Sequence, residues 1–89
     1  MSLADEHLGE AADGLRAAAM IADPYMRADA IWEAALRVES GGAHLQGRAA
    51  AVCDEIVRRL VDSCDGSDEP PAGAILIGYA RTLDGISAR

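Results

Sequence analysis

Apolar residues recur at three- and four-residue spacing along most of this chain, a pattern typical of amphipathic helices. We predict four helices, over residues 4–22, 24–39, 43–64 and 72–87. A short apolar run at 75–77 is the one strand-like segment, and the sequence offers no second strand to pair with it. The pattern therefore predicts an all-α fold, a small bundle of about four helices forming one domain over residues 1–89.

Turn-forming residues mark where the predicted helices begin and end. Asp23 followed by Pro24 predicts a helix start, because aspartate caps exposed N–H groups and proline fits the first helical position. Gly41 and Gly42 predict the end of that helix, because glycine readily adopts the left-handed conformation that terminates helices. The composition of residues 65–71 predicts a loop.

Three of the predicted helices carry one apolar face. The apolar face of the helix 4–22 is mostly alanine, which lets a neighbouring helix approach closely. Its members are Leu8, Ala11, Ala12, Leu15, Ala18, Ala19 and Ala22. The helix 43–64 is apolar over about half its circumference, and its other half holds Arg48, Arg58 and Arg59 interleaved with acids, a solvated and salt-bridged face. The face expected in 72–87 comprises Ile75, Leu76, Tyr79, Ala80, Leu83 and Ile86.

The helix 24–39 differs, because apolar residues cover more than half of its circumference. A helix that is apolar nearly all round is buried on more than one side. In a chain this short, a second burying surface often belongs to another chain, and Trp, Tyr and Met are enriched at such interfaces. We therefore predict an interface for self-association or partner docking at Tyr25, Met26, Ile31, Trp32 and Leu36. Glu33 and Arg37, one turn apart with the acid first, are suited to an ion pair.

Size and charge narrow the function classes. Chains of 89 residues have a thin stability margin that is often supplemented by oligomerisation, and we expect a homodimer. Fifteen acidic residues against eight arginines give a net charge of −7, which disfavours direct nucleic-acid binding and favours basic partners. No apolar run reaches the roughly 18 residues of a membrane helix, so we expect a cytoplasmic protein. The absence of Lys, Phe and Asn suggests a high-GC bacterium.

Three short motifs resemble functional signatures and fail on particular residues. Ile77-Gly78-Tyr79-Ala80-Arg81 resembles the opening strand of serine recombinases, but Leu83 stands where that family has its nucleophilic serine. Asp62-Ser63 resembles the attachment site of acyl carrier proteins, yet this serine closes a helix and Cys64 replaces the leucine that follows it. Aligning Gly66 with the glycine of a calcium-binding EF-hand loop places Val61 at the first ligand position, where its side chain has no oxygen to offer.

The cysteines and histidines form no predicted site. Cys53 and Cys64 lie about three turns apart on one helix, roughly 16 Å, too far for a disulfide. Neither has the closely spaced Cys or His of a zinc site, so we expect both to be small buried apolar residues. His7 and His44 lie near predicted helix starts, where we expect solvent exposure, and His44 is too far from Cys53 along one helix to activate it.

These observations predict no catalytic, cofactor-binding or metal-binding residue and no cofactor. The function expected is that of a non-enzymatic, acidic helical module for protein–protein interaction or oligomerisation. The second hypothesis is an acidic accessory or regulatory protein, antitoxin-like or phage-encoded, that binds a basic protein partner. Its distinguishing property is binding that weakens with added salt. A small enzyme is the third class, and it lacks a nucleophile–base pair at suitable spacing.

Overall fold

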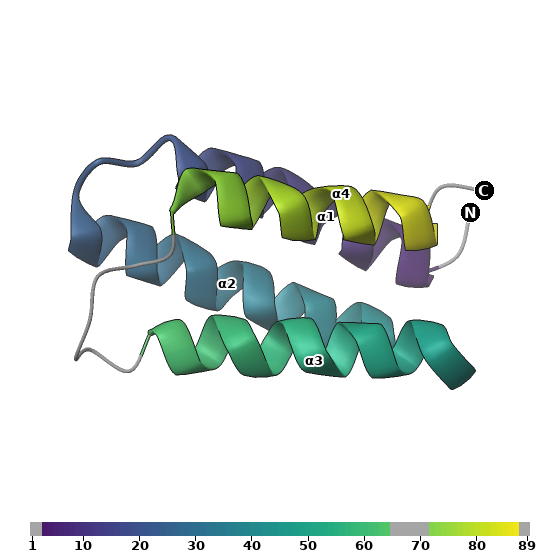
Figure 1. Cartoon of the computed structure of the whole chain (residues 1–89). Helices are drawn as coiled ribbons and strands as arrows, with labels where there is room; N and C mark the ends of the chain where they lie inside the picture. The colour runs from purple at the N-terminus through teal and green to yellow at the C-terminus, as the bar shows by residue number, and fades with distance from the viewer. Residues whose placement is uncertain (1–2, 65–71, 88–89) are drawn as a thin grey trace.

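A computed structural model describes residues 3–64 and 72–87, which form a bundle of helices (Figure 1). The elements are α1 (Leu3–Ala19), α2 (Pro24–Gly42), α3 (Gly47–Ser63) and α4 (Gly73–Ser87), and the described residues contain no strand. The predicted all-α class is therefore confirmed. The predicted loop at 65–71 lies outside the described residues. Over the part of the chain described, no helix has the length and apolar character needed to cross a bilayer.

Successive helices run antiparallel and form two layers, with α1 and α4 in one and α2 and α3 in the other (Figure 1). Contacts are extensive between α1 and α2, between α1 and α4, and between α2 and α3, whereas α3 and α4 barely touch. The packing order is therefore α4–α1–α2–α3, with α1 and α2 at the centre. The first two helices form a hairpin within one chain.

The alanine-rich face of α1 lies in the core, and neighbouring helices pack closely on it, as predicted. Its two large side chains are completely buried, and the small residues between them let α2 and α4 pack closely on either side. Ala22 is the exception, because α1 ends at Ala19 and leaves it exposed in the connection. The fully enclosed core members of α1 are Leu8, Ala11, Ala12, Leu15 and Ala18.

A side chain from α2 caps the C-terminal end of α1. The last carbonyls of a helix have no partner within it and need one from elsewhere. Arg27 supplies this: its Nε donates to the Ala18 carbonyl at 3.0 Å, and its terminal nitrogen donates to the Ala19 carbonyl at 2.9 Å. Gly73, at the start of α4, lies against the same end, since a Cβ there would be 3.3 Å from the Ala19 oxygen. This end of the bundle thus joins three helices.

The second helix begins where predicted but ends later. Asp23 is its N-cap in extended conformation with proline following, although the Asp23 side chain makes no capping hydrogen bond. Gly41 and Gly42 lie within its last turn instead of terminating it, because close packing requires them there. A Cβ at Gly41 would lie 2.9 Å from Leu8 Cδ2, and one at Gly42 would lie 3.0 Å from the Cβ of Cys53. These glycines therefore let α1 and α3 approach α2.

The third helix begins four residues later than predicted. Residues 43–46 form the connection from α2, in which Leu45 is partly buried against the core. Gly47 opens α3 with φ of +66°, a left-handed conformation that glycine adopts without strain. The chain thus turns sharply just before α3.

The fourth helix buries a narrower face than predicted. Leu76, Ala80 and Leu83 are fully buried, but Ile75 is about half exposed. The reason is the packing order: α4 rests on α1 and hardly touches α3, so it needs only one narrow apolar stripe. Tyr79 and Ile86 are partly buried at the edge of that stripe.

Candidate functional site

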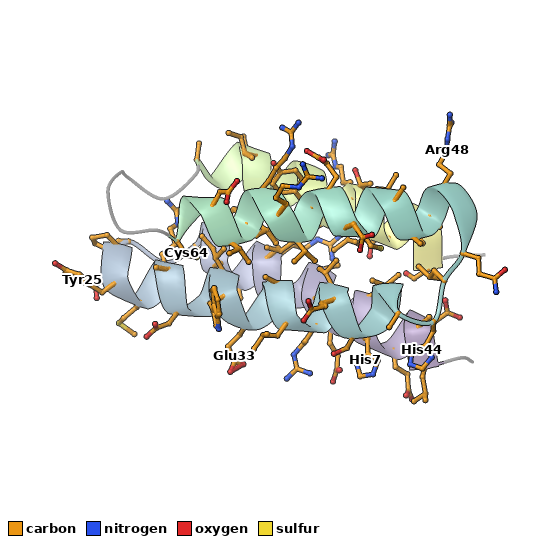
Figure 2. The ribbon with its side chains drawn as sticks, turned by 90° about the horizontal axis from the view of Figure 1, so that it is seen from below. His7, Tyr25, Glu33, His44, Arg48 and Cys64 are labelled. Atoms are coloured by element: carbon orange, nitrogen blue, oxygen red, sulfur yellow. The ribbon has the colours of Figure 1, made fainter. Side chains whose placement is uncertain are left out.

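The outward face of α2 carries most of the predicted interface. Tyr25, Met26, Trp32 and Leu36 are exposed, with exposed fractions of 83%, 60%, 47% and 48%. Figure 2 shows Tyr25 and Glu33 projecting from α2 away from the other helices. Ile31 is a correction: it is completely buried in the core, and so it is unavailable to a partner. We call Tyr25, Met26, Trp32 and Leu36 the α2 patch.

Helical geometry explains this division of α2. Its core positions, Ile31, Ala34, Ala35, Val38 and Gly41, recur every three or four residues and face α1 and α3. The Tyr25, Trp32 and Leu36 positions are seven and four residues apart and therefore form a second stripe on another side of the same helix. The broad apolar arc predicted from the sequence thus consists of one stripe that the chain buries and one that it leaves exposed.

A shallow groove runs beside the α2 patch, between α2 and α3. Its volume is about 150 Å³, and its wall is almost entirely apolar. The α2 side contributes Trp32 and Leu36, and the α3 side contributes Val57 and Val61. Ala35 forms part of the wall, and Glu39 is the one charged residue that lines it. The groove thus extends the α2 patch onto α3.

The charge around the α2 patch is negative and uncompensated. Asp29, Glu33 and Glu39 are exposed on α2, and none of them takes part in an ion pair or side-chain hydrogen bond among residues 3–64 and 72–87. The expected Glu33–Arg37 pair does not form. Arg37 instead binds Glu10 of α1 at 3.1 Å, because α1 packs along that side of α2.

Ion pairs form on and between the other helices. On α3, Glu55 binds Arg59 at 2.7 Å and Arg58 at 3.2 Å, as expected for a solvated face. The hydrogen bond from Arg59, followed by the charge of Arg58, lowers the pKa of the Glu55 carboxyl. The pKa of Arg59 is raised, first by Glu55 and then by a hydrogen bond with Tyr79 of α4.

The two cysteines follow the expectation only in part. Cys53 is fully buried, and burial, followed by the negative charge of Asp54, raises the pKa of its thiol. Cys64 is partly exposed at the end of α3, and its thiol lies 3.6 Å from the Ala28 carbonyl of α2, to which it donates. Both are free thiols, as predicted. A raised pKa keeps Cys53 in its unreactive neutral form.

The two histidines meet, which the sequence did not indicate. His7 of α1 and His44 of the α2–α3 connection stack with ring centroids 6.3 Å apart and planes 7° apart, at the end of the bundle seen in Figure 2. His7 is a correction, since it is partly buried and its Nδ1 is enclosed without a hydrogen-bond partner among residues 3–64 and 72–87. His44 is exposed as expected. Because α3 starts at Gly47, His44 does not share a helix with Cys53.

No group of three or more His, Cys, Asp or Glu residues within the described ranges is arranged to hold a metal ion. In comparisons with known proteins, no family model, no curated protein and no solved structure matches the chain. The function is therefore argued from the α2 patch and its surroundings.

Proposed function

We propose that this chain is a non-enzymatic protein-interaction module that docks through the α2 patch. The observation that carries the proposal is the pair of stripes on α2, one enclosed by the bundle and the other formed by half- to fully exposed Tyr, Trp and Leu side chains. Burying a large apolar side chain contributes about 1.5–3 kcal/mol. A helix with such a stripe gains stability when a partner covers it, and aromatic side chains are typical anchors of interfaces.

The sequence suggests two alternative binding partners for the α2 patch. A second copy of the chain would make the module a homodimer, in which the same patch meets itself across a two-fold axis. A basic protein would make it an acidic accessory or regulatory protein. The carboxylates of Asp29, Glu33 and Glu39 favour the second, because they are close to the patch in the helix and form no ion pair with another described residue.

Site-specific photo-crosslinking in the native host tests the proposal. A benzophenone amino acid would replace Leu36 in the α2 patch or, as a matched control, the exposed Ala51 of α3. We expect a discrete protein adduct from position 36 and none from position 51. An adduct of twice the chain mass indicates a second copy, and any other mass indicates a different protein. Equal labelling from both positions, or no adduct from either, would refute docking through α2.

A further inference from the structure

The groove between α2 and α3 has the dimensions of a single large side chain. A void of about 150 Å³ with an apolar wall holds a group the size of a benzene ring. Trp32 and Leu36 form one side of it, and Val57 and Val61 form the other. A leucine, methionine or phenylalanine side chain presented from outside would fill it, so the groove suits one apolar anchor.

The stripe beside the groove has the length and spacing of a helix-binding site. Tyr25 and Leu36 lie eleven positions apart on α2, about 16 Å along its axis, with Trp32 between them. A partner helix lying along α2 contacts such a stripe through its own residues at spacings of three, four and seven. About three turns of partner helix match this stripe, with one of its apolar residues in the groove.

The carboxylates determine which helix fits. Asp29 lies four residues after Tyr25 and three before Trp32, so it interrupts the stripe itself, while Glu39 lines the groove. Glu33 projects from the same helix, away from the bundle (Figure 2). The two arginines of α2 are already engaged, Arg27 with carbonyls of α1 and Arg37 with Glu10. Within residues 3–64 and 72–87, this surface therefore presents acidic groups that form no ion pair.

A second copy is a poor match for this surface. A two-fold contact between two α2 patches would bring two sets of unpaired carboxylates together, and like charges juxtaposed at an interface oppose binding. Lys or Arg residues flanking an apolar stripe would instead give each carboxylate an opposite charge. Resting on the proposed docking function, we infer that the occupant of the α2 patch is a basic amphipathic helix of another protein. Its apolar anchor enters the α2–α3 groove, and its cationic residues face Asp29, Glu33 and Glu39.

The probe for this inference is a synthetic two-heptad peptide of leucine and lysine, with the repeat Leu-Lys-Lys-Leu-Leu-Lys-Leu. A peptide of the same composition in an order that cannot form an apolar face is its control. Binding is measured by the fluorescence of the single tryptophan, Trp32, and mapped by amide chemical shifts in NMR. We expect the patterned peptide to bind more tightly than its control, with shifts concentrated on α2 and on the groove side of α3. Its affinity falls as salt screens the exposed charges.

A matched pair of double variants separates recognition by α2 from general attraction to an acidic protein. Asp29→Asn with Glu33→Gln removes two carboxylates beside the α2 patch, and Asp62→Asn with Glu6→Gln removes the same two types from exposed positions elsewhere. We expect the first double variant to weaken binding about five-fold, as for two modest charge contacts, and the second to change it less than two-fold. Unchanged melting temperatures verify that both variants fold.

The remaining outcomes discriminate between the two proposals. Equal weakening by both double variants, shifts away from α2, or no preference for the patterned peptide would overturn the basic-helix inference. A stable dimer by light scattering that Trp32→Ala converts to monomer would also overturn it, while leaving docking through α2 intact. Absence of any crosslink from position 36 refutes the docking function itself.

Discussion

The link between Arg27 and the end of α1 allows a quantitative test of how this bundle is held together. Replacing Arg27 with Met keeps an unbranched apolar stem and removes both donors. The carbonyls of Ala18 and Ala19 then lose partners that lie at 3.0 and 2.9 Å in the structure. The favourable interaction of a cation with the negative end of the α1 dipole is lost as well.

The loss in the free energy of unfolding that we expect from Arg27→Met follows from these contacts. Hydrogen bonds to charged groups contribute about 1.5–3 kcal/mol each when enclosed. Arg27 is only partly buried and water can reach the freed carbonyls, so the two bonds together contribute about 2 kcal/mol. In a domain of this size, 1 kcal/mol corresponds to about 4–8 °C, and we expect the midpoint of thermal unfolding to fall by roughly 10 °C.

Far-ultraviolet circular dichroism during heating and during urea titration measures this change. Arg48→Met is the matched control, because Arg48 is exposed on α3 and makes no side-chain hydrogen bond or ion pair within residues 3–64 and 72–87. We expect the control to stay within about 0.5 kcal/mol of the parent chain. If Arg27→Met also stays within that margin, Arg27 does not hold the end of α1 and the reasoning is wrong.

Three other changes give distinct expected outcomes. Gly41→Ala should lower the free energy of unfolding by about 1–2 kcal/mol, because the added Cβ would lie 2.9 Å from a leucine of α1. Gly9→Ala should raise the free energy of unfolding by up to about 1 kcal/mol, because its Cβ would meet no other atom within 4 Å. Equal effects of the two substitutions in urea titrations would contradict the packing described. Leu15→Ala should cost about 3 kcal/mol and Leu36→Ala less than about 1 kcal/mol by the same assay, since only the first is enclosed. The Cys53 thiol should react with iodoacetamide far more slowly in the native than in the unfolded chain, as measured by mass spectrometry of its peptide. Its raised pKa also predicts a stability contribution that is complete below pH of about 8.5 and declines as pH rises further, a decline that Cys53→Ala should remove.

The spacing of apolar residues in the sequence is sufficient to predict the four helices and most of the buried core residues. The starts of α2 and α4 lie within one residue of prediction, because proline marks the first and an apolar stripe follows the second. The α1 face was recoverable because alanine and leucine recur strictly at helical spacing. Gly41 shows the limit: its role depends on Leu8, thirty-three positions earlier, and local turn chemistry alone assigned it to a helix end.

The α2 patch could be predicted in composition but not in detail. The sequence shows that α2 has more apolar surface than one neighbour needs. Which side is buried depends on where α1 and α3 pack, and so Ile31 could not be separated from Trp32 beforehand. Long-range side-chain contacts were equally inaccessible: the His7–His44 stack and the Arg37–Glu10 pair each join segments whose proximity only the tertiary packing determines.

The order α4–α1–α2–α3 also bears on how the molecule opens. Regions with few buried contacts unfold locally at a lower free energy than the whole domain. Since α3 rests on α2 and scarcely meets α4, we expect it to open at a lower free energy than α1 does. Amide protons of α3 should therefore exchange with deuterium sooner than those of α1. The α2–α3 groove lies at this contact, so its two walls belong to the part of the bundle that we expect to open first.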